Sequence, residues 1–181
     1  FQGEPRLEPY PRLLPGGRAA LEAIRRRYAR DPEFAQTVDG VASNRNMLFQ
    51  AAAWAASGNV EAGDRAIQSL VGVSPGLPRE SGNYGNGLTI ALTYDLLRDH
   101  PTWTPDMRAR IGLTLRRMIK ETLLLLDGDS PSMWHGRFQL GCSAWLVAAA
   151  LDVESWENDK AMFAQVQRHF IESLRAIQIT G

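Results

Sequence analysis

The sequence predicts an all-α protein built from antiparallel helix pairs in two layers. Apolar residues recur at the three- and four-residue spacing of helices along most of the chain, and no segment alternates like a strand. Three pairs of predicted helices follow one another at roughly 40–50 residues. In each pair the first helix is apolar and rich in alanine, whereas the second is more amphipathic. This difference is typical of an inner and an outer layer of helices.

Composition and charge are those of a globular protein. The chain has 181 residues, of which 44% are hydrophobic and 22% charged, and its formal net charge is zero. The length allows one domain with a sizeable core, and the balanced charge gives no indication of nucleic-acid binding. No apolar run reaches the ~18–20 residues that a membrane span requires.

The cysteine and histidine residues give no metal site. Cys142 is the only cysteine, so an intrachain disulfide and a cysteine-based metal site are excluded, and we expect it in the core. His100, His135 and His169 fall in different predicted elements without metal-ligand spacing. We therefore expect neither a metal nor another cofactor.

The chain begins with two segments outside the predicted helical domain. Residues 1–3, Phe-Gln-Gly, match the remnant of a protease-cleavable purification tag and are set aside from the fold. Residues 4–17 contain four prolines and are expected to form an extended arm, with the helical domain over residues 18–181. A start without initiator Met or signal peptide suggests an exported protein, so we expect a periplasmic or secreted location.

The first predicted helix covers about residues 18–30, and Pro32 is expected to end it. The run of arginines at 25–27 is interpreted as a solvated face. The apolar positions share the other face: Leu21, Ile24 and Tyr28.

The first helix pair is predicted at about residues 43–57 and 60–71. Ser43 is expected to cap its first helix, and Gly58 and Asn59 form the turn. Two helices joined by so short a loop form an antiparallel αα-hairpin.

The second pair follows a loop rich in Gly, Pro and Ser. It is predicted at about residues 84–98 and 105–126. Thr104 is expected to cap the longer helix, with Pro105 at its first position, where proline is favoured.

The third pair is predicted at about residues 138–151 and 157–177. Trp134, His135 and Arg137 are expected in a loop at the mouth of its apolar first helix. Helix N-termini carry free N–H groups and partial positive charge, which suits anionic groups.

The pairing predicts where a site would form. In successive hairpins the first helices run parallel, so the loops before them gather at one end. Each residue there also has a structural explanation: Asn83 fits a turn, and His135 fits the rim of a capped core helix. The expected site residues combine amide, arginine, aromatic and histidine side chains: Arg45, Asn83, Tyr84, Trp134, His135, Arg137 and Gln139.

Three segments resemble the helical domain of the heparinase II/III-like and alginate-lyase-like polysaccharide lyases. Tyr10-Pro-Arg-Leu-Leu14 resembles the opening HPRLL segment of that family. Ala91-Leu-Thr-Tyr-Asp-Leu-Leu97 resembles its A-x-x-Y-D-x-L inner helix. Trp134-His-Gly-Arg-Phe-Gln-Leu-Gly141 resembles its N-N-H-x-x-W…G segment. The three segments follow in the family's order and span nearly the whole chain.

The resemblance implies an incomplete (α/α) toroid followed by a β-sandwich domain, with this chain ending within the toroid. It implies β-elimination of a uronate-containing polysaccharide, so the expected partner is an anionic polysaccharide or oligosaccharide. His135 takes the family's histidine position, as general base or substrate-positioning group. The residues expected to bind substrate are Trp134, Arg137, Asn83, Tyr84, Gln139 and Arg45.

The chain departs from the family pattern at two places. Trp134 stands where the family has an Asn that neutralises the substrate carboxylate. A Trp can stack on a sugar face but cannot neutralise a carboxylate, so Arg137 or Asn83 would have to do so. The family's catalytic Tyr falls beyond Gly181.

These departures favour an alternative, a carbohydrate-binding or scaffold module without catalysis. A glycoside hydrolase on a related toroid is a second alternative. It needs two carboxylates across a cleft. Glu80 is the one acid expected at the rim, and Asp95 falls about three turns inside its predicted helix, so the sequence favours this alternative less.

Overall fold

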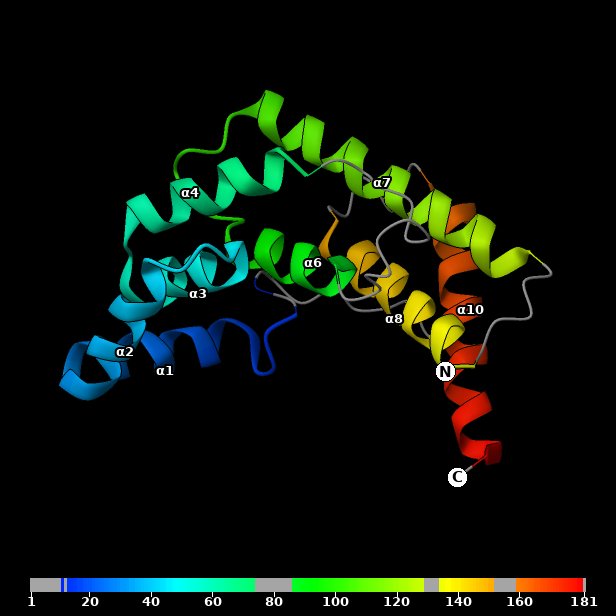
Figure 1. Ribbon diagram of the computed structural model, residues 1–181, viewed down its shortest axis with the longest axis horizontal. Coiled ribbons are helices and arrows are strands. Elements are labelled where there is room, and N and C mark those ends of the chain that lie inside the picture. The colour runs from blue at the N-terminus through cyan, green and yellow to red at the C-terminus, as the bar shows by residue number, and fades with distance from the viewer. Residues whose placement is uncertain (1–10, 12, 74–85, 129–133, 152–158, 181) are drawn as a thin grey trace.

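The computed structural model describes residues 11, 13–73, 86–128, 134–151 and 159–180, with the backbone alone at 86, 134–139 and 176–180 (Figure 1). This part of the chain is all-α, which confirms the predicted class, and none of its helices is long and apolar enough to cross a membrane. The helices are α1 (Gly17–Arg30), α2 (Pro32–Ala42), α3 (Met47–Ser57), α4 (Val60–Val71), α6 (Asn86–Leu96), α7 (Pro105–Asp127), α8 (Trp134–Ala150) and α10 (Lys160–Thr180).

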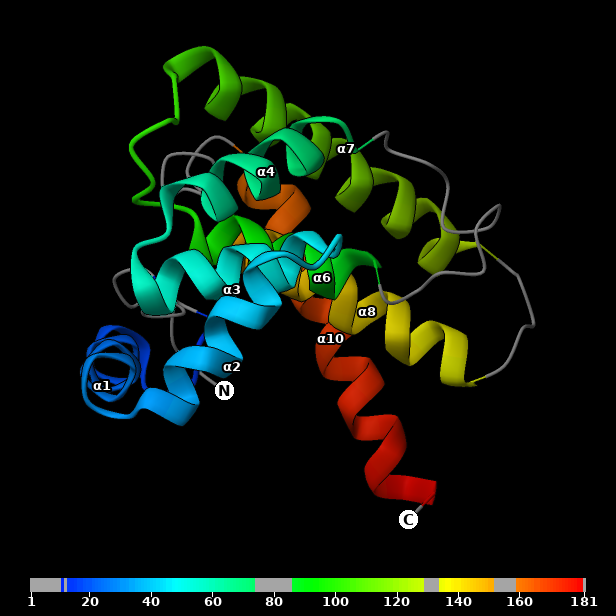
Figure 2. The same cartoon turned by 60° about the vertical axis from the view of Figure 1, so that its left-hand side comes forward.

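Three helices form a central row. α6 packs between α3 and α8, and all three begin on the same side of the molecule (Figures 1 and 2). α4 and α7 lie over one side of this row. α10 begins beside α7 and crosses α8, so that its last turns extend away from the other helices (Figures 1 and 2). The parallel course of α3, α6 and α8 is the arrangement that the sequence predicted.

The core lies between the central row and the helices over it. Fully burying one Leu or Ile side chain contributes about 1.5–3 kcal/mol, so these contacts supply most of the driving force for layer packing. A second, smaller cluster around Val38 and Ala53 joins α2 to α3 and α4. The largest fully buried apolar side chains of the main core are Ile67, Leu70, Tyr94, Leu97, Ile111, Leu115, Ile119, Leu126, Leu151 and Val166.

The α3–α4 hairpin follows from its turn residues. Gly58 has a left-handed backbone (φ 78°) and its N–H donates to Trp54 O at 2.7 Å, which closes α3. Asn59 then caps α4, because its side chain accepts the N–H of Ala62 at 3.0 Å. The predicted turn is confirmed.

The prediction of Ser43 as an N-cap was wrong. Ser43 ends α2, and α3 begins later, at Met47, capped by Asn46 through the N–H of Leu48 at 2.9 Å. Asn44 stabilises the turn between α2 and α3, because its side-chain oxygen accepts the Asn46 N–H at 2.8 Å.

Helix α2 was missed by the sequence prediction. Pro32 does not only end the pattern of α1; it is the first residue of α2. Asp31 caps this helix by accepting the N–H of Phe34 at 3.1 Å. Proline at the first helical position loses no hydrogen bond there, which is why a new helix can start at once.

The second predicted pair is arranged differently from a simple hairpin. α7 packs on α8, α4 and α10 rather than on α6. The link between α6 and α7 is anchored in the core by Trp103, whose Nε1 donates to Leu97 O at 2.6 Å and whose ring meets Tyr94 edge-on. This link carries the chain past α6 onto α8. Thr104 caps α7 as predicted, accepting the N–H of Met107.

The end of the N-terminal arm is a turn, not an extended strand. The Gly17 N–H donates to Leu14 O at 2.7 Å, and Gly16 and Gly17 both have positive φ. The Leu13 N–H donates to Asp95 Oδ2 of α6 at 2.9 Å. The turn therefore docks the arm on the central row. Apart from Pro11 and Pro15, the other arm residues lie outside the described part.

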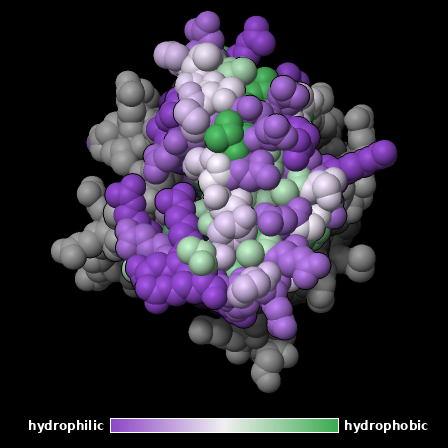
Figure 3. All heavy atoms as spheres, turned by 90° about the vertical axis from the view of Figure 1, so that its left-hand side faces the viewer, coloured by the Kyte–Doolittle hydropathy of each residue, from purple (hydrophilic) through white to green (hydrophobic). Residues whose placement is uncertain are grey.

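Arginines donate to backbone carbonyl groups at the ends of α2 and α3 and in the turn after α6. Arg25 donates to Ala55 O at 2.8 Å, Arg65 to Ala42 O at 3.0 Å, and Arg108 to Arg98 O at 3.1 Å. Residues 25–27 are all exposed, as the solvated-face interpretation predicted, and the Arg25 guanidinium also joins α1 to α3. Figure 3 shows that the left-hand side of Figure 1, where α1 meets α2 and α3 ends, is largely hydrophilic.

Candidate functional site

The frame of the candidate site is the end of the molecule where α3, α6 and α8 begin. In Figures 1 and 2 these starting ends lie on one side, and the first turn of α8 projects beyond the start of α6. The opposite ends of α3 and α6 hold the Gly58–Asn59 turn and the link to α7. The free N–H groups of the central helices are thus directed to a single side of the fold.

The first turns of α8 carry four of the predicted residues. The helix begins at Trp134, so the expectation of a loop over 134–137 was wrong. Trp, His and Gly are poor helix formers, but α8 packs against α6, α7 and α10, and these contacts override local preference. Trp134, His135, Arg137 and Gln139 occupy two successive helical turns, and their side chains lie outside the described residues.

Helical spacing sets how these four positions relate. Positions 135 and 139 are four residues apart, and positions 134 and 137 are three apart, so each pair lies on adjacent turns of one side. A histidine and an amide therefore share one strip of α8, and a Trp and an Arg share another. Successive residues turn by about 100° around a helix, so the histidine–amide strip and the Trp–Arg strip lie on nearly opposite sides of α8. The four positions share the first two turns of α8 but not one face.

Arg45 lies at the start of α3 and is exposed. Among the described residues it makes no ion pair. Its neighbours are engaged in building the turn: Gln50 Nε2 donates to Asn44 O at 2.6 Å, and Asn46 caps the helix. Because α6 lies between α3 and α8, the structure does not bring Arg45 next to the first turn of α8.

The remaining predicted site residues are not described. Asn83 and Tyr84 precede α6 and lie outside the described residues, as does Glu80. Asp95, the other acid considered for a hydrolase, is 1% exposed and accepts the Leu13 N–H. Its position indicates a structural role in docking the arm.

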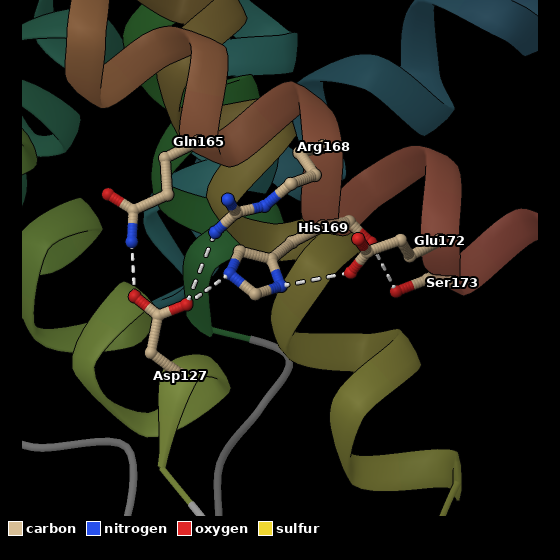
Figure 4. Close-up of polar contacts among 6 residues, drawn as sticks. All are labelled: Asp127, Gln165, Arg168, His169, Glu172 and Ser173. Atoms are coloured by element: carbon tan, nitrogen blue, oxygen red, sulfur yellow. Dashed lines mark hydrogen bonds and ion pairs between the residues drawn. The ribbon is translucent and has the colours of Figure 1, made fainter.

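A polar cluster that the sequence did not reveal joins α7 to α10 (Figure 4). His169 Nε2 lies 2.8 Å from Asp127 Oδ1, and Arg168 Nη2 lies 3.5 Å from the same oxygen. Gln165 donates to the other oxygen of Asp127. His169 Nδ1 lies 3.6 Å from a carboxylate oxygen of Glu172. The sequence placed His169 only as a structural or exposed residue, because nothing local links positions 42 residues apart.

The described residues hold no group of three His, Cys, Asp or Glu side chains that could bind a metal ion. Cys142 is half-buried rather than fully in the core, and burial raises the pKa of its thiol. A raised thiol pKa disfavours the thiolate, so this cysteine lacks the character of a nucleophile.

Comparisons with protein-family models, with curated proteins and with solved structures found no match.

Proposed function

We propose that the protein binds an anionic polysaccharide at the end where α3, α6 and α8 begin, and acts as part of a polysaccharide lyase. The observation that carries the proposal is the shared side of these starting ends, with the first turns of α8 projecting from it (Figures 1 and 2). The proposal includes the finer fold, an incomplete (α/α) toroid followed by a β-sandwich domain, and a periplasmic or secreted location.

The chemistry of β-elimination suits this end of the molecule. The reaction removes the weakly acidic proton from the carbon beside a uronate carboxylate. The electron pair of that C–H bond forms a double bond to the neighbouring carbon, and the glycosidic oxygen leaves from that neighbour. The carboxylate must be neutralised by hydrogen-bond donors or cations, and a proton carrier must sit within reach. In the proposal, Arg137 and the N–H groups at the start of α8 neutralise charge, and His135 takes or positions the proton.

The remaining residues have binding roles in the proposal. Trp134 stacks on a sugar ring, since pyranose faces present C–H groups to aromatic rings. In the proposal, Gln139 and Asn83 donate hydrogen bonds to hydroxyl or carboxylate oxygens, and Tyr84 is a further substrate-binding residue. Arg45 lies further along the same side of the molecule and would contact a more distant sugar unit of the polymer.

The direct test is formation of unsaturated product. The full-length protein is incubated with alginate, heparan sulfate and hyaluronan, and the ultraviolet absorbance of the new double bond is followed. We expect absorbance to rise with one polymer and His135→Ala to lower the rate at least a hundredfold, the size of a lost general base. Arg26→Ala, on the exposed face of α1, is the control and should match wild type. A His135→Ala rate equal to wild type would remove His135 from the mechanism.

A binding module without catalysis is the second candidate. Trp134 in place of a carboxylate-neutralising residue favours it, because stacking binds sugar without activating the proton. Saturable binding of an oligosaccharide without any bond cleavage by the full-length protein would decide for this candidate.

A further inference from the structure

Asp127 lies where an acidic residue is unfavourable. It is the last residue of α7, and the C-terminal end of a helix carries partial negative charge. The last turn of α7 has no basic residue to offset this charge. An acid at this position therefore needs compensation from another element.

The compensation comes from one face of α10 (Figure 4). Gln165, Arg168 and His169 are three and four residues apart, so they project from adjacent turns, and all three contact the Asp127 carboxylate. His169 is 7% exposed and its Nε2 lies 2.8 Å from Asp127 Oδ1. The Asp127 side chain is 43% exposed, so only the histidine side of this contact is buried. A hydrogen bond to a carboxylate is still more directional than an apolar contact.

The same turn of α10 also contacts α8. Ser173 donates to His169 O at 2.7 Å, and a Cβ atom on Gly141 would lie 2.8 Å from Ser173 Oγ. Gly141 is thus the point where α8 approaches α10 closely, two turns from the start of α8. The end of α7 and the start of α8 lie near each other on one side of the molecule (Figures 1 and 2).

We propose that Asp127 and His169 are positioning residues for the proposed site. They hold the end of α7 against the part of α10 that packs on α8, and so fix the first turns of α8, which carry His135 and Arg137. This inference rests on the proposed function. Neither residue is assigned contact with substrate; each acts through the placement of α8.

The test combines hydrogen exchange with steady-state kinetics on the full-length protein. The substrate is whichever of alginate, heparan sulfate or hyaluronan the wild type cleaves. Asp127→Ala and His169→Gln should speed amide exchange over residues 134–141 by about tenfold or more, with smaller effects elsewhere. They should lower kcat roughly tenfold to a hundredfold through misplacement, with KM changed less than about threefold.

Two further variants make the test specific. Asp127→Asn keeps an oxygen that can accept from His169, so it should restore part of kcat and of the protection from exchange. Glu22→Gln removes an exposed acid 3.9 Å from Arg26 on α1, which packs on α2 and α3, and should leave both readouts unchanged. If Asp127→Ala fails to fold, Asp127→Asn and His169→Gln carry the comparison.

Each outcome separates this inference from the function it rests on. Wild-type exchange over residues 134–141 in the folded variants overturns the inference, as does faster exchange with wild-type kcat. An effect confined to KM would indicate substrate contact and also overturn it. A wild type that cleaves none of the polymers removes the proposed function, and that result is known before any variant is measured.

Discussion

His100 is buried between α3 and α4. It is 2% exposed, its ring centroid lies 4.8 Å from that of Trp54 on α3, and its Nδ1 accepts the Thr102 N–H at 3.3 Å. On α4, a Cβ atom at Gly63 would lie 2.2 Å from His100 Nε2. His100, in the link after α6, therefore fills the space beside Gly63, where a larger residue would clash with its ring.

The first prediction at this scale concerns Gly63. Gly63→Ala should lower the free energy of unfolding by about 1–3 kcal/mol, because the added methyl overlaps the ring of His100 and has no room to relax. Thermal and denaturant unfolding measure the change. Gly112→Ala is the matched control: no atom lies within 4 Å of its Cβ position in α7, so alanine should stabilise by up to about 1 kcal/mol. Equal stability of the two variants would contradict the packing around His100.

The second prediction concerns acid stability at Asp31. The backbone N–H of Phe34, and then the Arg27 side chain, hold the pKa of this carboxyl below its ordinary value of 3.8. A lowered folded-state pKa means that the stabilisation is complete above the unfolded value and is lost as the pH falls through the folded one. The stability difference between wild type and Asp31→Asn should therefore be constant near neutral pH and shrink below pH 3.8. A difference that does not change with pH in this range would contradict the assignment.

Local sequence signals predicted several helix ends, and tertiary packing decided the others. Gly58-Asn59 and Thr104-Pro105 carry their own turn and cap chemistry, so the ends they define were predictable. Asp31-Pro32 carries an equally local signal, a capping acid before a proline. Because Pro32 was interpreted only as the end of the preceding helix, α2 was not predicted. The start of α8 at Trp134 had no such signal, because it depends on packing against α6, α7 and α10.

The prediction for the elements concerns the contact of α6 with α8. A Cβ atom on Gly87 would lie 2.8 Å from both Cβ and Oγ of Ser143. Gly87→Ala should therefore force the two helices apart and cost about 1–3 kcal/mol of stability. Ser143→Gly alone should cost less, through helix propensity. The double variant should be more stable than the sum of the two changes implies, which a double-mutant cycle measures. Strict additivity would show that the helices are not in close contact here.

At the scale of the whole molecule, the pairing of helices predicted more of the site than any single residue did. The common side of α3, α6 and α8 followed from the order of apolar and amphipathic helices. The Asp127–His169 contact did not, because it joins residues of α7 and α10 whose proximity depends on how the layers cross. The separation of Arg45 from α8 was also not predictable, since it depends on α6 lying between them.

The most direct measurement of the central claim is a binding footprint on the full-length protein. Hydrogen exchange is compared with and without an oligosaccharide of alginate, heparan sulfate or hyaluronan that binds saturably. The account predicts protection in the first turns of α8, over residues 134–141, and a smaller effect around Arg45. Protection confined to the opposite end, at Gly58–Asn59 and the link before α7, would contradict it.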